Sequence, residues 1–158
     1  MSDQIKSQNS DIQQLPSEFS TFITRMCGAH QWKITESDEE HACIQFAVNE
    51  TRSQTLFVFY FDNSLEFSVP SFAAFDSLEN VPHLISSTLL QINAKTKLGF
   101  WCLEQIGERI VYTYMHNASM ENVTEYIFGE IVTSLIQRVE EFESLLEKIP
   151  KDSNAKTD

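Results

Sequence analysis

The sequence predicts an α+β domain, in which three helices pack on an antiparallel sheet of about six strands in the order α-β-β-β-β-α-β-β-α. Residues 55–61 form an unbroken run of β-branched and aromatic side chains, which is typical of a strand covered on both faces. Short turns, among them Asp62-Asn63-Ser64, join this run to its neighbours, and such turns favour antiparallel hairpins. Near the C-terminus apolar residues recur at helical spacing, which predicts one long covering helix.

The length of 158 residues suits one domain, and the polar ends of the chain set its limits. The hydrophobic fraction of 42% and the charged fraction of 22% are ordinary for a globular protein. Residues 1–15 and 150–158 are polar, and we expect both to be disordered tails. The single α+β domain is therefore expected to span residues 16–149.

The chain is strongly acidic, and this argues against two classes of partner. Eleven Lys and Arg stand against 23 Asp and Glu, which gives a formal net charge of −12. Nucleic-acid binding depends on clustered cations that neutralise phosphates, and anionic membranes attract basic segments, so neither partner is expected. The acidity serves solubility, or it complements a basic patch on a partner.

The three cysteines, Cys27, Cys43 and Cys102, are widely spaced, odd in number and without a Cys-x-x-Cys motif. Residues 1–6 lead into no apolar stretch, so we expect no secretory signal. No run approaches the roughly 20 apolar residues that a membrane helix needs. We therefore expect a cytoplasmic protein with reduced thiols and no membrane segment.

The first helix is predicted to begin at Pro16-Ser17-Glu18 and to end near Gly28. Its apolar stripe consists of Phe19, Phe22, Ile23 and Met26. A meander of four strands follows, with a weak strand at 32–36, a half-buried strand at 42–48, the central run at 55–61 and a fourth strand at 65–69. Pro70 lacks a ladder donor and therefore suits a strand end or a sheet edge.

Residues 71–80 are irregular and rich in aromatic side chains, which predicts a packed loop whose conformation the sequence leaves open. Pro82 opens a second helix that ends near residues 95–97, and residues 98–105 and 108–116 form a hairpin. Ser119 is expected to cap the last helix, which runs to about Lys148. Its stripe is Val123, Ile127, Ile131, Leu135, Val139, Phe142 and Leu146. Gly129 interrupts this helix and predicts a close approach to its backbone.

The last hairpin and the central run are apolar on both faces, although helices usually cover only one face of an antiparallel sheet. The second face must meet the 71–80 loop, a second subunit or a client protein, unless the three helices are divided between the two faces. Alternation along the strands gives two candidate interface sets, and the sequence does not say which points outward. One set is Trp101, Leu103, Val111 and Met115, and the other is Phe100, Tyr112 and Tyr114, with Phe67 joining from a neighbouring strand.

The chain resembles the YbjN-like family of small bacterial proteins, which is similar in fold to type III secretion chaperones. The resemblance covers about 17–149. It rests on segments within 56–70, on the strand at 110–112 and on the long last helix. Two further segments carry it, Leu89-Leu90-Gln91-Ile92-Asn93 and Leu98-Gly99-Phe100-Trp101. It implies a non-enzymatic, chaperone-like or regulatory protein, often a dimer, with no catalytic residues to carry over. The 71–82 segment departs from the pattern because Phe72 and Phe75 make it more apolar than a plain connector.

No catalytic, cofactor or metal signature stands out in the sequence. The histidines His30, His41, His83 and His116 are scattered over four predicted elements, although His41 and Cys43 share one strand face two residues apart. Cys102 lies in a strand between Trp101 and Leu103, where a buried, unreactive thiol is the default. The four glycines do not cluster into a phosphate-binding loop. We therefore expect neither an enzyme nor a bound cofactor.

Two functions remain open. The first is a protein-binding or chaperone-like regulator, a homodimer that holds an unknown protein client on an apolar sheet face or groove. The alternative is a module that senses a small ligand in an apolar pocket between the sheet and the last helix.

Overall fold

The computed structural model describes residues 17–149, so the tails expected at 1–15 and 150–158 lie outside the described residues. Its elements follow the predicted order, with two additional short 3-10 turns. They are α1 (Glu18–His30), β1 (Ile34–Ser37), β2 (His41–Ala47), β3 (Ser53–Phe61), β4 (Ser64–Phe75), η1 (Leu78–Asn80), α2 (His83–Asn93), β5 (Phe100–Ile106), β6 (Arg109–Ser119), η2 (Met120–Asn122) and α3 (Glu125–Lys148).

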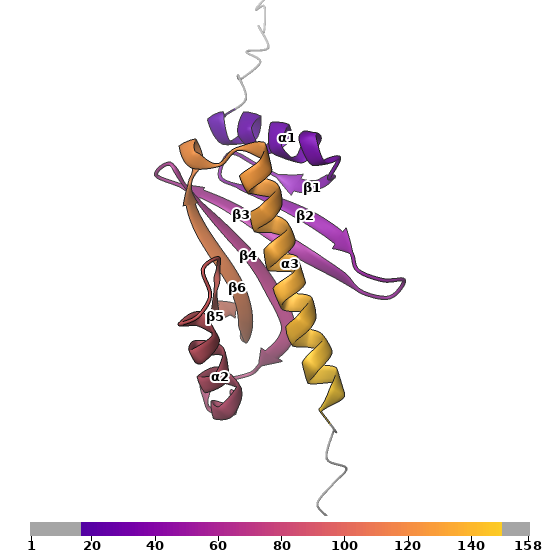
Figure 1. Ribbon diagram of the computed structural model, residues 1–158, viewed down its shortest axis with the longest axis vertical. Helices are drawn as coiled ribbons and strands as arrows, with labels where there is room; N and C mark the ends of the chain where they lie inside the picture. Colours follow the sequence, from indigo (N-terminus) through magenta and orange to yellow (C-terminus); the bar gives the residue numbers. More distant parts are fainter. Residues whose placement is uncertain (1–16, 150–158) are drawn as a thin grey trace, which may run out of the picture.

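The strands form one antiparallel six-stranded sheet in the spatial order β1-β2-β3-β4-β6-β5, which confirms the predicted fold class (Figure 1). The predicted aromatic strand, β3, lies inside the sheet between β2 and β4, as its uncharged composition requires. The two edges are the short strand β1 and the strand β5.

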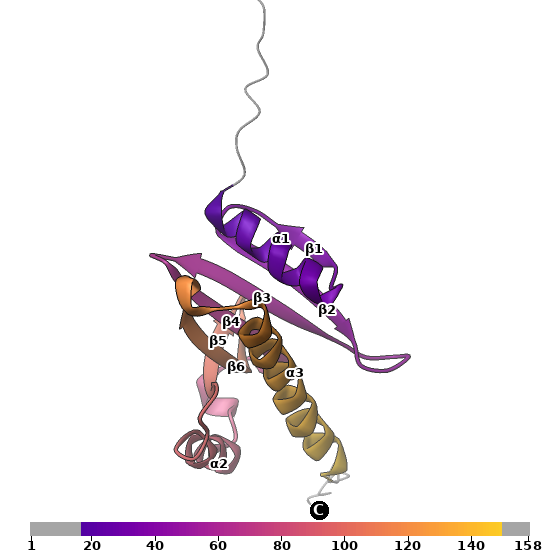
Figure 2. The same ribbon diagram turned by 45° about the horizontal axis from the view of Figure 1, so that its top comes forward.

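All three helices pack on the same face of the sheet, which we call the helix face. Phe19 of α1 stacks on Tyr60 at 5.6 Å between ring centroids, and Phe128 of α3 lies 5.7 Å from Phe67. Ser86 of α2 lies 2.6 Å from the hydroxyl of Tyr112. The strand registers place Tyr60, Phe67 and Tyr112 on one face. Figure 2 shows α1 beside β1 and β2, and α2 at the far end near β5. Within 17–149, no helix therefore covers the opposite, open face.

Two predicted helix boundaries are corrected by the capping geometry. The first helix continues past Gly28, and it is Gln31, in the left-handed conformation at φ 58°, that ends it. The last helix begins after Thr124, whose hydroxyl accepts the Ile127 N–H, and not at Ser119. Ser119 instead ends β6, because that strand pairs with β4 up to Ser119, which lies opposite Ser64.

The 71–80 segment differs from the predicted loop. Strand β4 continues to Phe75 past an irregularity between Pro70 and Ala74, and Leu78–Asn80 then form a 3-10 turn. The bulge accommodates Pro70, which has no N–H to donate, and pairing with β6 resumes at Ala74 opposite Val111. Phe75 packs against the core and meets the ring of Tyr112 edge-on.

The expected close approach at Gly129 is present, and a side chain makes it. A Cβ atom at Gly129 would lie 2.5 Å from Cε1 of His30, so only glycine leaves room for this ring. The Nε2 atom of His30 is 2.8 Å from the carbonyl oxygen of Glu125 in the first turn of α3. This contact fixes the end of α1 against the start of α3.

A buried carboxylate fixes the other end of α3 to the sheet. Glu143 is 2% exposed and accepts hydrogen bonds from the backbone N–H of Phe72 at 2.7 Å and from the Gln54 amide at 2.6 Å. The Arg52 guanidinium lies beside it and pairs with Glu140 and with Glu147. Burial, the strongest influence, raises the pKa of Glu143 above the ordinary 4.5, while the bonds from Phe72 and Gln54 oppose this.

The raised pKa of Glu143 predicts a pH dependence of stability. Folding favours the protonated carboxyl, so the stability that Glu143 contributes is fully present below about pH 4.5. This stability is lost as the pH rises through the pKa of Glu143 in the folded protein. We compare the free energy of unfolding of the native protein with that of Glu143→Gln, measured in urea titrations at a series of pH values. The native value minus the variant value is expected to fall as the pH rises through this window. Glu141→Gln controls for the loss of one negative charge from α3. A difference that rises with pH contradicts the assignment.

Candidate protein-binding surfaces

The strand register divides the candidate interface residues differently from the two predicted sets. Trp101 lies opposite Tyr114 and Leu103 opposite Tyr112, whereas Phe100 lies opposite Met115. The helix face therefore holds Phe67, Trp101, Leu103, Tyr112 and Tyr114, and the open face holds Phe100, Val111 and Met115. The predicted grouping was wrong because it assumed an offset of one residue between the two strands of the hairpin. A register shift of one residue moves every side chain of a strand to the opposite face of the sheet.

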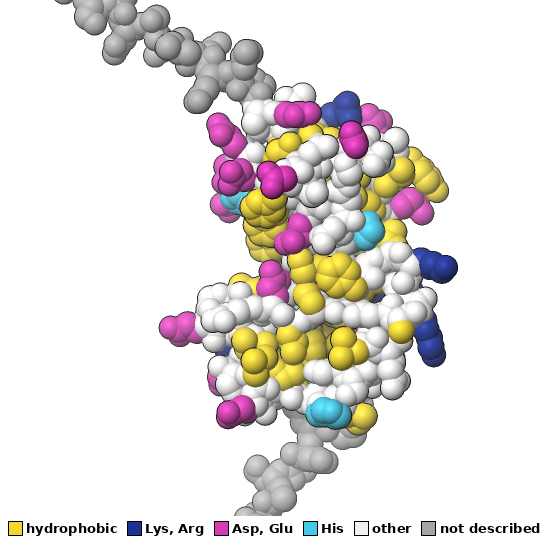
Figure 3. Space-filling view, turned by 90° about the vertical axis from the view of Figure 1, so that its left-hand side faces the viewer, with side chains coloured by type: hydrophobic (Ala, Val, Ile, Leu, Met, Phe, Trp, Pro, Cys, Tyr) yellow, Lys and Arg dark blue, Asp and Glu magenta, His cyan; other side chains and the backbone are white. Residues whose placement is uncertain are grey.

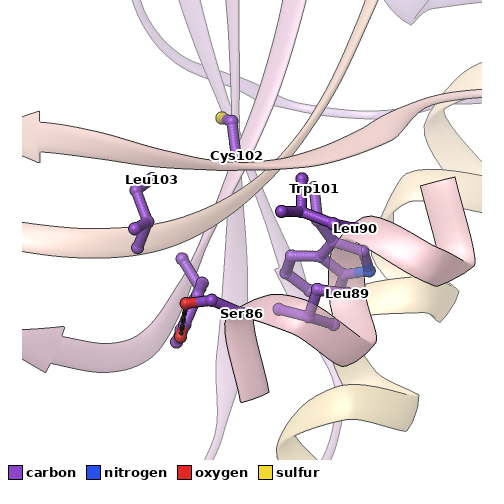
Figure 4. Close-up of a pocket in the computed structure, with 7 residues that line it drawn as sticks. Ser86, Leu89, Leu90, Trp101, Cys102 and Leu103 are labelled. Atoms are coloured by element: carbon purple, nitrogen blue, oxygen red, sulfur yellow. Dashed lines mark hydrogen bonds between the residues drawn. The ribbon is translucent and has the colours of Figure 1, made fainter. Parts of the chain in front are cut away.

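A strongly apolar surface lies where α2 meets the edge strand β5. A hollow of about 120 Å³ opens there and has almost no polar lining. We call it the α2–β5 groove; its walls are Ser86, Leu89, Leu90, Trp101, Leu103 and Tyr112, with Cys102 contributing from the strand. Trp101 and Leu103 point toward α2, while the sulfur of Cys102 points to the other side of the strand (Figure 4).

Exposed hydrophobic side chains surround this groove. Leu84 is 77% exposed and Leu90 65% exposed, and Ile92 and Leu103 are also open to solvent. Figure 3 shows hydrophobic side chains gathered over α2 and β5, with acidic side chains at the margin. A contiguous apolar patch of this kind is typical of an interaction site. The sequence contains an indication of this patch, because α2 has no Asp, Glu, Lys or Arg and its leucines lie on more than one side of the helix.

A second, larger hollow of about 300 Å³ lies between α2 and the C-terminal half of α3. Trp101 and Phe142 form its floor, with ring centroids 4.6 Å apart. Leu84, Leu145 and Ile92 contribute apolar walls, and Arg138 and Glu141 lie at its polar side. Trp101 is its lining residue from the sheet, so the hollow lies next to the space between the sheet and the last helix where the small-ligand alternative places a pocket.

Asn93, at the end of α2, closes part of the free edge of β5. Its side-chain amide donates to the carbonyl of Trp101 at 2.8 Å and accepts the Trp101 N–H at 2.7 Å. The amide thus occupies the position of a residue on a neighbouring strand. These two bonds hold the C-terminus of α2 against β5 and so fix the shape of the groove.

The open face carries a row of aromatic rings along β3. Phe57, Phe59 and Phe61 stack at 6.2 and 6.4 Å between centroids, and His41 of β2 stacks on Phe59 at 6.2 Å. Phe61, at the end of the row, is 56% exposed. Aromatic rows of this kind offer flat apolar contact area, so the open face is a second candidate surface.

The open face also carries acids. Glu66 lies in β4, and burial together with the nearby Glu104 raises the pKa of its carboxyl. Unlike the α2–β5 groove, this face therefore combines apolar area with negative charge.

Cys102 and Cys27 lack the environment of a nucleophile. Burial, and then the nearby Glu104 and Glu66, raises the pKa of Cys102 to about 11, and burial alone raises that of Cys27 to about 11. Both thiols are therefore protonated near neutral pH, whereas a catalytic cysteine needs a lowered pKa. Cys102 donates to the sulfur of Met115 at 3.2 Å, which fits its predicted structural role.

Comparison with known proteins identifies the fold and no family. No protein-family model matches the chain, and no curated protein sequence matches it significantly. A chain in the solved structure of the HopA1-SchA chaperone-effector complex is similar, with a TM-score of 0.58 and 8% sequence identity over 80% of this chain and 93% of that one. The likeness supports the expected type III secretion chaperone-like architecture. In addition, no helix of the described residues is long and apolar enough to cross a membrane.

Proposed function

We propose that this protein is a non-enzymatic, chaperone-like protein that forms a homodimer through the α2–β5 groove and binds a polypeptide client. The observation that carries the proposal is the solvent-exposed leucine surface of α2, a helix without Asp, Glu, Lys or Arg, beside an apolar hollow. A regulatory role of the YbjN-like kind and a cytoplasmic location remain parts of the same proposal.

Two properties favour a second copy of this chain at the α2–β5 groove. A two-fold interface must be complementary to itself, and this patch has both protruding side chains, Leu84 and Leu90, and a hollow that can receive them. Two chains that each carry a formal charge of −12 repel one another, so their contact must exclude carboxylates. Helix α2 meets this condition, because it contains no Asp or Glu.

The client is assigned to the open face, which stays free when α2 and β5 are occupied. The row of Phe57, Phe59 and Phe61 offers apolar contact, and Glu66 on the same face adds negative charge. A segment that combines apolar and basic side chains would match both features. The fold likeness to a chain of a chaperone-effector complex is consistent with this role.

The proposed dimer predicts that Leu90→Asp prevents self-association. A carboxylate at the centre of an apolar interface must be desolvated without a partner, so we expect the dimer dissociation constant to rise at least 100-fold, or about 2.7 kcal/mol. Sedimentation velocity over a concentration series measures this change, and circular dichroism checks the fold. Tyr126→Asp, at a 73% exposed position on α3, is the matched control and should leave the dimer intact. A native protein that sediments as a monomer at every concentration refutes the dimer.

The small-ligand alternative rests on the hollow of about 300 Å³ between α2 and α3, which is near the lower limit for metabolite sites. A thermal-shift screen of apolar metabolites tests it, because a ligand at 100 times its dissociation constant adds about 2.7 kcal/mol of stability. A hit that Leu145→Arg abolishes, while Tyr126→Arg does not, favours the sensor over the chaperone.

A further inference from the structure

We propose that Glu36, His41 and Cys43 bind a zinc ion at the β1–β2 edge of the sheet. One oxygen, one nitrogen and one sulfur from these side chains lie within 4.8 Å of one another. They come from two adjacent strands, and none of them belongs to the α2–β5 groove or to the contacts that hold the helices. The sequence indicated only that His41 and Cys43 share a face; the third ligand follows from the fold.

A β-bulge brings Glu36 into this group. The register of β1 against β2 shifts by one residue between Ile34, which lies opposite Ile44, and Glu36, which lies opposite Cys43. Without the shift Glu36 would lie opposite Ala42 and would point to the helix face, where Ala42 is fully buried. The bulge therefore turns a carboxylate away from the core and toward the thiol and the imidazole, as bulges near binding sites do.

Asp38 holds the imidazole of His41 in the orientation that a metal requires. Its carboxylate lies 2.7 Å from Nδ1 of His41, while Nε2 faces Glu36 at 3.6 Å. The Asp38 carboxylate also accepts the backbone N–H groups of Glu40 and His41, both at 2.8 Å, so its position is fixed. A histidine that donates Nδ1–H to a carboxylate keeps the lone pair of Nε2 available, which is the usual arrangement at zinc-binding histidines.

The ligand types and the local charge select the metal. A thiol and an imidazole exclude calcium and magnesium, which prefer oxygen, whereas sulfur, nitrogen and carboxylate oxygen together suit Zn²⁺. Ligand atoms of a tetrahedral zinc site lie about 3.3–3.8 Å apart. Glu36 and His41 already meet this spacing at 3.6 Å, and the remaining distances, which lie within 4.8 Å, require a closure of about 1 Å around the sulfur of Cys43.

The remaining ligand would be water, and the thiol proton would leave to solvent when the Zn–S bond forms. Glu39 and Glu40, with Asp38, add negative charge to the turn that joins the two strands. This charge favours the cation.

Cobalt(II) substitution tests the site directly. The purified protein, treated with chelator and then titrated with Co²⁺, should develop a thiolate-to-cobalt charge-transfer band in the near ultraviolet together with visible bands of tetrahedral intensity. Addition of Zn²⁺ should remove both with a stoichiometry of one. Cys43→Ser should abolish the charge-transfer band, and Asp38→Asn should weaken binding roughly 10–100-fold by releasing the imidazole.

The controls separate this site from adventitious binding. Cys102→Ser removes a half-buried thiol elsewhere on the open face and should leave the spectrum unchanged. Glu36→Gln alters an exposed edge residue that the fold does not need, and it should weaken Zn²⁺ binding at least 10-fold. A spectrum without the charge-transfer band in the native protein, or a band that survives in Cys43→Ser, overturns the proposal, as does unchanged affinity in Glu36→Gln.

Discussion

Replacing Phe128 with alanine is expected to lower the free energy of unfolding by about 3–5 kcal/mol, the range for a fully buried phenylalanine. Phe128 is 0% exposed and packs where α1, α3 and the sheet meet. Its ring lies 6.2 Å from that of Phe22 in α1, 6.1 Å from Trp32 and 5.7 Å from Phe67 in β4. Removal of the ring leaves a cavity where α1, α3 and the sheet meet, and none of these neighbours can fill it without losing its own contacts.

Urea denaturation followed by fluorescence and circular dichroism measures this effect. Tyr126→Ala, two residues earlier on the same helix and 73% exposed, is the control and should change stability by no more than about 0.5 kcal/mol. A loss below about 1 kcal/mol for Phe128→Ala would show that α1 and α3 do not share a rigid core at this point.

Gly99→Ala is expected to lower the free energy of unfolding by about 2–5 kcal/mol, which is the sum of two effects. Gly99 adopts φ 78°, where a Cβ atom costs about 1–2 kcal/mol. An added Cβ would also lie 2.6 Å from Cε1 of Tyr114, a fully buried ring whose hydroxyl donates to the Leu98 carbonyl at 2.7 Å. The ring cannot move without breaking this bond or losing its contact with Trp101, so overpacking adds about 1–3 kcal/mol.

Gly107 provides a matched control for the backbone contribution. It adopts φ 60° in the β5–β6 turn, but nothing lies within 4 Å of an added Cβ atom. Gly107→Ala should therefore lower the free energy of unfolding only by the backbone strain of about 1–2 kcal/mol. Thermal and urea unfolding of the two variants give the comparison, and equal losses would show that Tyr114 yields to the methyl group.

The order of elements was predictable because local signals agree with the fold. Asp62-Asn63-Ser64 and the alternation on both sides of 55–61 define antiparallel hairpins without help from distant residues. The 71–75 stretch was not predictable, because strand β4 is continued there by its pairing with β6, a contact between segments far apart in the chain. For the same reason Ser119 belongs to a strand, although its chemistry suits a helix cap.

The candidate surfaces were predictable in composition but not in orientation. Apolar residues on both sides of β5 and β6 indicated surplus hydrophobic surface, yet the side to which each points depends on the register of one hairpin. Likewise, Glu36 gave no sign of joining His41 and Cys43, because one extra residue in an edge strand decides its direction.

The amide of Asn93 has a consequence for how this protein can meet an extended peptide. Recognition by strand addition needs a continuous row of unsatisfied backbone groups along an edge. At Trp101 that row is already occupied, so an incoming segment could pair with β5 only from residue 103 onward, and the opposite edge, β1, is just four residues long. Neither border of the sheet therefore offers a long template, which protects an otherwise aromatic-rich sheet from growing chain by chain into fibres.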